Sequence, residues 1–381
     1  MTETPSPAAL SAPPLSPANE ALLASFREGK PLALARLISV VENERDGFQA
    51  LLHRLLRQDS SGGARVGITG PPGAGKSSLV TALASTCRGR DEEVGIVAVD
   101  PTSPYSGGAL LGDRIRMNEL ATDPGVFIRS MASRGSLGGL ATTSREVVDV
   151  MDAFGFHRIL IETVGVGQTE LEVAGSADTV VVVLVPESGD GIQAMKAGLM
   201  EIADIFVVNK ADRPGAHRLA RELESALHYR TGKGAGTVPA HHGVDLSATG
   251  KDSEPARDEA VPDEGDGPED WTPPVLLTMA QTGEGVDELL EAVARHRSWL
   301  AESGALEERR RARTADRIRD VLDRELKRRV RRALAEVDLL EDALDRIRRD
   351  TATPYSVAAE YLARMGIDPA EHTSLPQTSP S

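Results

Sequence analysis

The segment "GPPGAGKSS", residues 70–78, has the residue types and spacing of a phosphate-binding loop. Its glycines let backbone N–H groups approach phosphate oxygens, and a helix that begins directly after the loop attracts anions. In this pattern Lys76 reaches the outer phosphates and the Ser77 hydroxyl ligates Mg²⁺. A glycine-rich turn with a surface lysine is the alternative. The expected nucleotide contacts are Gly70, Pro71, Pro72, Gly73, Ala74, Gly75, Lys76, Ser77 and Ser78.

A second motif, "NKAD" at residues 209–212, follows the apolar run "DIFVVN". The Asp212 carboxylate can accept two hydrogen bonds from guanine, and adenine lacks that pair of donors. Asn209 is then expected to support the pocket, Lys210 to pack its stem over the base, and Ala280 to add a backbone contact. Taken alone, the tetrapeptide also fits the start of a helix with Asp212 as its cap. Downstream of a phosphate loop it predicts guanine specificity.

Two further carboxylates are candidates for the metal site. Asp100 ends an apolar run, and Asp113 follows a Pro/Gly/Ser-rich segment. Carboxylates near a triphosphate can hold Mg²⁺ through its water ligands, because Mg²⁺ keeps much of its hydration shell. Both residues also fit a structural role, Asp100 as the cap of a turn and Asp113 as the cap of a helix.

The segment "RILIETVGVGQTE", residues 158–170, places a glycine three residues after Glu162, where nucleotide hydrolases usually carry Asp before the glycine. Glu is one methylene longer and can meet the water shell of the metal from a strand set further back. Gly165 is expected to donate its N–H to the γ-phosphate, and Gln168 is a candidate for positioning the attacking water. The predicted catalytic residues are therefore Lys76, Glu162, Gly165 and Gln168.

Lys196 lies in a further glycine-bearing loop, "PESGDGIQAMKAG" at residues 186–198. It can reach an acidic partner or the edge of the nucleotide. A solvated lysine on a helix is the default interpretation.

The elements that position these motifs are short apolar runs that alternate with helical stretches. Their near-continuous hydrophobicity is typical of parallel strands covered on both faces, and the alternation predicts a doubly wound α/β domain. The expected strands are "RVGIT" (65–69), "VGIVAV" (94–99), "RILIE" (158–162), "TVVVVLV" (179–185), "DIFVVN" (204–209) and "VLLTM" (275–279).

Helical patterns flank this domain on both sides. Residues 18–57 carry apolar positions three and four apart, and so do residues 306–350, where one apolar stripe must be covered by the chain's own helices or by a second subunit. We expect these divisions: a disordered tail (1–17), an N-terminal helical extension (18–62), the phosphate-loop domain (63–300), a C-terminal helical arm (301–368) and a second tail (369–381).

The composition limits the class of partner. The formal net charge of −15 argues against broad nucleic-acid binding. Residues 251–270 alone hold nine carboxylates against two basic side chains, and we expect about 231–270 to form a mobile surface insertion in which His241 and His242 are solvated. No run approaches the roughly 18 apolar residues that a membrane span needs. The single cysteine, Cys87, and the lack of a targeting pattern favour a cytoplasmic protein.

Together, "GPPGAGKSS", "AVDPTSP…GGALLGDRIRM", "RSMASRGSLGGLA", "ILIETVGVGQTE" and "VVNKAD" resemble the MeaB/ArgK family of methylmalonyl-CoA-mutase-associated GTPases, over roughly residues 20–365. The resemblance implies a GTP-hydrolysing chaperone that gates cofactor loading into an adenosylcobalamin-dependent mutase and protects that enzyme. It also implies that the C-terminal arm forms a homodimer and that Lys196 relays the nucleotide state. The implied Mg²⁺ shell is Ser77, Asp100, Asp113 and Glu162. The acidic insertion and the extended N-terminal tail depart from the family pattern but leave the motifs intact.

Two other classes of function share this kind of domain. A kinase of a transport system would use the same phosphate loop, but no separate acceptor pocket is identifiable in the sequence. A nickel or zinc metallochaperone GTPase needs a Cys- or His-rich ligand set, and the chain offers Cys87, His241 and His242. We expect Cys87 to be a small buried apolar group.

Overall fold

The computed structural model describes residues 14–57, 62–101, 117, 120–133, 142–163, 173–186, 198–230, 271–335, 339–364 and 366. The chain divides into two compact units, Met1–Arg313 and Thr314–Ser381, which are described separately below. Most of the predicted N-terminal tail, the acidic insertion and the predicted C-terminal tail lie outside the described residues.

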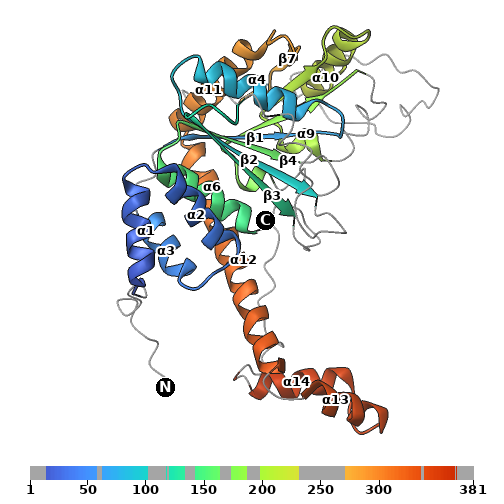
Figure 1. Cartoon of the computed structure of the whole chain (residues 1–381). Coiled ribbons are helices and arrows are strands. Elements are labelled where there is room, and N and C mark those ends of the chain that lie inside the picture. The colour runs from blue at the N-terminus through green and yellow to red at the C-terminus, as the bar shows by residue number, and fades with distance from the viewer. Residues whose placement is uncertain are drawn as a thin grey trace, which may run out of the picture. The chain divides into compact units, whose positions relative to one another are not determined.

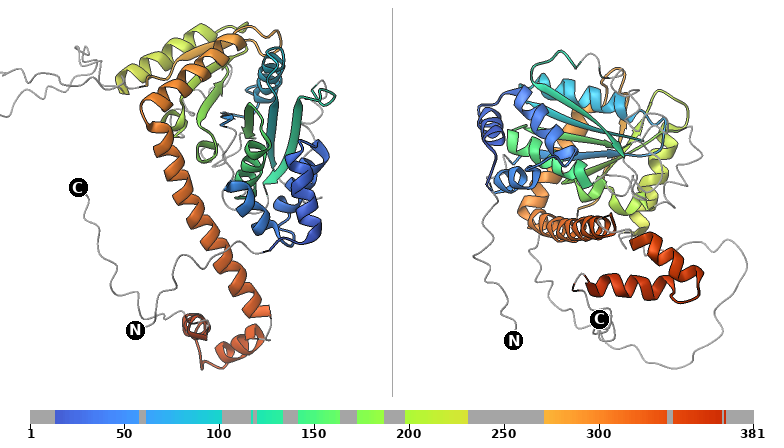
Figure 2. Two further views of the ribbon diagram at one scale, coloured as in Figure 1. Left: turned by 90° about the vertical axis from the view of Figure 1, so that its left-hand side faces the viewer. Right: turned by 60° about the horizontal axis from the view of Figure 1, so that its bottom comes forward.

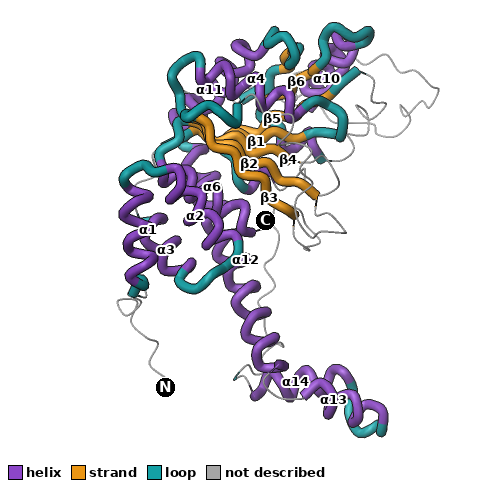
Figure 3. The backbone as a smooth tube through the Cα atoms, viewed as in Figure 1, coloured by secondary structure: helices purple, strands orange, loops and turns teal. Residues whose placement is uncertain are grey.

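The first unit is built on one parallel sheet with the strand order β3-β2-β4-β1-β5-β6-β7 (Figures 1 and 3). Strands joined by crossovers and ordered this way form a doubly wound sheet, as predicted. The strands are β1 (Ala64–Thr69), β2 (Val94–Pro101), β3 (Val126–Ser133), β4 (Arg158–Thr163), β5 (Thr179–Leu184), β6 (Ile205–Asn209) and β7 (Val275–Thr278).

Six of these strands match the predicted apolar runs, and β3 was not predicted. Its sequence "VFIRSMAS" is interrupted by Arg129 and by two serines. Among the described strands, β3 lies at the edge of the sheet and pairs with β2 alone. An edge strand tolerates such polar residues because one of its sides is not enclosed by a neighbouring strand.

Helices cover both faces of the sheet (Figure 2). On one face, α4 (Lys76–Arg88) and α11 (Val286–Glu302) pack on residues such as Ile68 and Ile96. On the other face, α6 (Thr142–Phe154) and α10 (Ala216–Arg230) pack on the alternate residues of the same strands. Two short helices, η2 (Val173–Gly175) and α9 (Leu199–Ile202), also belong to the described part of this unit.

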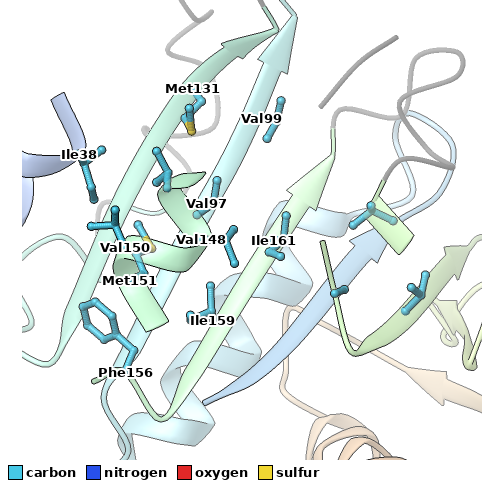
Figure 4. Packing of buried hydrophobic residues seen from close by; sticks show 14 of the residues in the cluster. Ile38, Val97, Val99, Met131, Val148, Val150, Met151, Phe156, Ile159 and Ile161 are labelled. Atoms are coloured by element: carbon cyan, nitrogen blue, oxygen red, sulfur yellow. The ribbon is translucent and has the colours of Figure 1, made fainter. Parts of the chain in front are cut away.

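Figure 4 shows the core on the α6 face, where Val97 and Val99 of β2 meet Ile159 and Ile161 of β4. Val148 of α6 packs against them, and each of these side chains is at most 3% exposed. Burial of one such side chain stabilises the fold by roughly 2 kcal/mol. The ends of β2 and β4 carry candidate site residues. Packing on the α6 face of the sheet therefore fixes their position.

The predicted N-terminal helical segment forms three helices, α1 (Pro17–Arg27), α2 (Pro31–Glu42) and α3 (Phe48–Leu56). Their buried residues belong to the same core cluster as the α6 face of the sheet. Phe26 meets Phe154 of α6 edge to face at 5.2 Å between ring centres, and Glu42 forms an ion pair with Arg129 of β3. The three helices thus extend the core of the sheet.

The helix α12 (Ala305–Ala335) begins at the ends of β5 and β6 that lie opposite the phosphate loop. Asp204, directly before β6, accepts two hydrogen bonds from the Arg309 guanidinium at 2.8 and 3.0 Å. The ring of the fully buried His296 lies 3.3 Å from the same carboxylate. Burial alone raises the pKa of Asp204, but its interactions with His296 and Arg309 outweigh it and hold the pKa below its ordinary value.

A second ion pair joins α12 to the start of β5. Arg313 lies 2.5 Å from a carboxylate oxygen of Asp178, and it donates to the carbonyl of Ala177 at 2.8 Å. Asp178 is 3% exposed. The first turns of α12 are therefore fixed to the sheet by two arginines whose carboxylate partners are buried.

An aromatic cluster lies beside these pairs. Trp271, the first described residue before β7, donates its indole N–H to the Asp204 carbonyl at 2.8 Å. Its ring centre lies 4.7 Å from that of His296 and 5.9 Å from that of Trp299. The chain therefore enters β7 through a packed aromatic contact.

The second unit contains the rest of α12, α13 (Leu339–Arg348) and α14 (Pro354–Arg364). Arg346 joins α13 to α14 through Glu360 at 2.9 Å. Part of the predicted apolar stripe is open: Ile318 and Leu322 are each 56% exposed, and Leu326 is 47% exposed. Among the described residues, no helix has both the length and the apolar character to cross a membrane.

Candidate nucleotide-binding site

The predicted phosphate loop connects β1 to α4, in the strand–loop–helix context that its motif requires. Gly70 has φ 137°, and a Cβ atom there would lie 2.1 Å from the carbonyl oxygen of Val183. Gly75 has φ 86°, and a Cβ atom would lie 2.5 Å from the Asn209 amide nitrogen. Both positions therefore require glycine, because any side chain would strain the backbone and collide with a neighbouring element.

Lys76 is the first residue of α4 and is only 6% exposed. Its ammonium group donates to the carbonyl oxygens of Gly70 and Pro71 at 2.7 and 3.0 Å. The lysine therefore lies across the loop, with its charge held where the motif places phosphate oxygens. A bound phosphate that accepts these hydrogen bonds in place of the carbonyls pairs its negative charge with the positive charge of the ammonium group.

Ser77 and Glu162, two of the residues expected to belong to a Mg²⁺ shell, lie side by side. The Ser77 hydroxyl donates to the Glu162 carboxylate at 2.7 Å, and the two residues are 6% and 4% exposed. A hydroxyl and a carboxylate are the hard oxygen ligands that Mg²⁺ prefers, so this pair fits the ion. Asp100 lies at the end of β2, beside Ala132 of β3, but its side chain is outside the described residues, as is all of Asp113.

Asn209, the last residue of β6, joins the phosphate loop to the base-binding segment. Its amide nitrogen donates to the Ala74 carbonyl at 2.9 Å. Its amide oxygen accepts from the Ala280 N–H and from the Thr278 hydroxyl, both at 3.2 Å. Asn209 is 2% exposed, so this side chain is a buried link between two loops that are far apart in the sequence.

Lys210 and Asp212 follow at the mouth of the same pocket. Lys210 adopts a left-handed conformation, φ 59°, and donates to the Gly73 carbonyl at 2.9 Å. Its stem therefore spans the gap between the two loops. A cavity of about 250 Å³ lies here, lined by Gly75, Ser78, Asn209, Lys210, Asp212, Arg213, Met279, Ala280, Gln281 and Thr282. The predicted base-reading residues thus share one pocket with two residues of the phosphate loop.

Several predicted residues cannot be placed. Gly165, Gln168 and Lys196 lie outside the described residues, as do His241 and His242. Cys87 is fully buried on α4, and burial raises the pKa of its thiol to about 12, so it stays neutral. Within the described ranges, no three His, Cys, Asp or Glu side chains gather closely enough to hold a metal.

Sequence reasoning missed the threonines that support the site. Thr278 donates to Asn209, and the Thr163 hydroxyl donates to that of Thr69 at 3.0 Å. Thr69 and Thr163 end strands directly beside Gly70 and Glu162, and Thr278 ends β7 two residues before Ala280. Their position in the sequence could have identified them, because a polar residue at the end of an apolar run lies at the edge where the loops carry the chemistry.

Comparison with known proteins agrees with this geometry. A profile of the family described as methylmalonyl Co-A mutase-associated GTPase MeaB matches residues 34–335. A protein of Pyrococcus horikoshii, provisionally named a GTPase, is 42% identical, with 90% of this chain and 97% of that protein covered. The methylmalonic aciduria type A homolog of Mus musculus, a mitochondrial protein, is 32% identical, with 74% of this chain and 64% of that protein covered.

A solved structure named LAO/AO transport system kinase superposes with a TM-score of 0.60 at 25% identity. The superposition covers 93% of this chain and all of the other. The profile match includes the phosphate loop, Glu162, the base-reading residues and the first turns of α12.

Proposed function

Since the chain belongs to the MeaB family of methylmalonyl-CoA mutase-associated GTPases, we propose that it is a GTP-hydrolysing chaperone for an adenosylcobalamin-dependent acyl-CoA mutase. In this role it gates the loading of the cofactor into the mutase and protects the mutase from inactivation. The family description and the name of the mouse relative support the link to a mutase. The single observation that carries the proposal is the buried Asn209 link, which joins a phosphate loop to a base pocket.

Guanine selection follows from the pocket. The Asp212 carboxylate accepts from the guanine N1–H and exocyclic amine, and the Lys210 stem covers one face of the base. Adenine would leave the carboxylate without a donor, which disfavours it. Ala280 contributes to the pocket through its N–H, which also holds the Asn209 amide in place.

Hydrolysis follows from the phosphate end of the site. Lys76 neutralises charge on the outer phosphates, and Ser77 and Glu162, with Asp100 and Asp113, would hold Mg²⁺. When bound, this ion would supply positive charge beside the phosphate oxygens. Gly165 and Gln168 are proposed to contact the γ-phosphate and the attacking water, and Lys196 to transmit the nucleotide state to the mutase.

The same proposal includes a homodimer and a cytoplasmic location. The exposed apolar residues Ile318, Val321, Leu322 and Leu326 recur at intervals of three and four on α12, so they form one stripe. A second copy of the chain would cover this stripe with its own.

Single-turnover GTP hydrolysis, measured with and without the purified mutase, tests the function. We expect slow turnover by the chain alone and at least a ~10-fold increase with the mutase, as for other nucleotide switches that rely on a partner. Lys76→Ala provides the inactive control. Equal rates with and without the mutase would count against the chaperone function, and phosphate found on an acceptor molecule instead of in solution would favour a kinase.

A further inference from the structure

The hydroxyl groups of Thr69 and Thr163 form a buried pair in the sheet directly beneath the phosphate loop. The Thr163 hydroxyl donates to the Thr69 hydroxyl at 3.0 Å, and the two residues are 1% and 0% exposed. Thr69 is the last residue of β1, directly before Gly70, and Thr163 is the last residue of β4, directly after Glu162. The pair therefore joins the two strand ends from which the phosphate loop and the metal-binding carboxylate extend.

The alternation of side chains places this pair on the opposite face of the sheet from the Ser77–Glu162 contact. In the parallel pairing of β1 with β4, Ile68 lies beside Glu162. Both point toward α4, because Ile68 belongs to the core under that helix and Glu162 meets Ser77. The next residues, Thr69 and Thr163, therefore point to the α6 face. The end of β4 therefore makes a side-chain contact on each face of the sheet, with Ser77 of α4 on one face and with Thr69 of β1 on the other.

The chemistry of the pair argues for a role beyond filling space. Valine has almost the same shape as threonine and is favoured in buried strands, and the strand residue beside Thr69 is Val182. Packing alone would accept valine at both positions. A hydroxyl that is buried here is useful for its directional bond, which fixes the position of one strand end relative to the other.

We propose that Thr163 is a positioning residue for the magnesium site. Through its bond to Thr69 it fixes the end of β4 against the start of the phosphate loop, so that the Glu162 carboxylate stays opposite the Ser77 hydroxyl. The inference rests on the proposed function, because it assigns to Glu162 and Ser77 the holding of Mg²⁺. Groups that orient metal ligands in this way typically contribute about 10- to 100-fold to metal affinity.

The test measures the release of a fluorescent GDP analogue from the full-length protein as a function of Mg²⁺ concentration. Thr163→Val keeps the shape and removes the hydroxyl. In this variant we expect half-maximal slowing of release to need a Mg²⁺ concentration about 10-fold higher than in wild type. Release in EDTA should stay within about twofold of wild type, since no metal is then held. Thr163→Ser keeps the hydroxyl and should show the wild-type Mg²⁺ dependence. Thr69→Val removes the acceptor of the same hydrogen bond and should show the same defect as Thr163→Val.

Thr86→Val is the matched control, because the Thr86 hydroxyl bonds only to the Ala82 carbonyl within α4 among its described contacts. Three results would overturn the proposal: an unchanged Mg²⁺ dependence of Thr163→Val, an equal acceleration of release in EDTA, or no rescue by serine. If Thr163→Val does not fold, Thr69→Val and Thr163→Ser decide the question by the same criteria. Loss of the Mg²⁺ effect in wild type would instead refute the proposed metal site.

Discussion

Asp212 is the residue whose chemistry decides between guanine and adenine. Asp212→Asn exchanges an acceptor for a group that also donates, so we expect GTP affinity to fall by about 100-fold and affinity for xanthosine triphosphate to rise. Competition binding against a fluorescent GDP analogue measures both changes. Asp287→Asn is the control, because Asp287 lies on α11 and pairs with Arg90 away from the pocket. An Asp212→Asn protein that still prefers GTP would refute the base assignment.

We expect the negative charge of Glu162 to matter more for GTP hydrolysis than for nucleotide binding. Glu162→Gln keeps an oxygen that can accept from the Ser77 hydroxyl, so the local fold should persist while the carboxylate charge is lost. We expect single-turnover hydrolysis to fall by about 100-fold and nucleotide affinity without Mg²⁺ to change by less than about threefold. Parallel losses in rate and in Mg²⁺-free affinity would show that Glu162 has a structural role instead.

Site residues differed in how far the sequence could determine them. Lys76, Ser77, Asn209 and Asp212 belong to motifs whose spacing reflects phosphate and base geometry, so the sequence alone assigned each of them to the phosphate end or the base end of one nucleotide site. The Thr69–Thr163 pair was not foreseen. Its significance depends on strands that are 94 positions apart in sequence and become neighbours only in the folded sheet.

At the scale of elements, the ion pairs at the start of α12 anchor that helix. Asp204→Asn would leave Arg309 beside a neutral amide, and we expect a loss of about 2 to 3 kcal/mol in the free energy of unfolding. This value is below the full cost for a buried pair, because Arg309 is 38% exposed. Thermal unfolding followed by circular dichroism measures the loss. Asp316→Asn, in an exposed pair with Arg319, should cost less than about 0.5 kcal/mol.

The same carboxylate predicts a pH dependence with a definite sign. The pKa of Asp204 is lowered by folding, so its ionised form is favoured in the native state. The stabilisation is complete above the unfolded pKa, about 3.9, and is lost as the pH falls through the lower folded pKa. The difference in melting temperature between wild type and Asp204→Asn should therefore shrink only in strongly acidic buffer. A difference that disappeared near neutral pH would contradict this assignment.

Strands and helices were predicted from the sequence where the apolar pattern is strong. They were missed where polar residues interrupt that pattern. The run "TVVVVLV" predicted β5 well, whereas Arg129, which pairs with Glu42 of α2, concealed β3. The first turns of α12 gave no sequence signal for their arginine pairs. Arg309 and Arg313 look like ordinary members of a charged helix until Asp178 and Asp204 approach them in the fold.

At the scale of the whole molecule, the exposed stripe on α12 predicts self-association. Leu322→Glu places a charge in the middle of the stripe, and we expect a dimer to become a monomer at micromolar concentration. Light scattering coupled to size-exclusion chromatography measures the mass. Leu32→Glu is the control, since Leu32 is 63% exposed on α2, far from α12 in the sequence. A monomeric wild type, or a variant that stays dimeric, would contradict this assignment.

The aromatic cluster before β7 gives the protein a built-in optical reporter. The chain contains two tryptophans, Trp271 and Trp299, and both lie against His296 beside the anchor of α12. Indole emission responds to nearby charge and to solvent, so the native emission spectrum reports this one location without a label. Binding of a partner or a nucleotide that loosens α12 from β6 would change the wavelength and the intensity of this tryptophan emission.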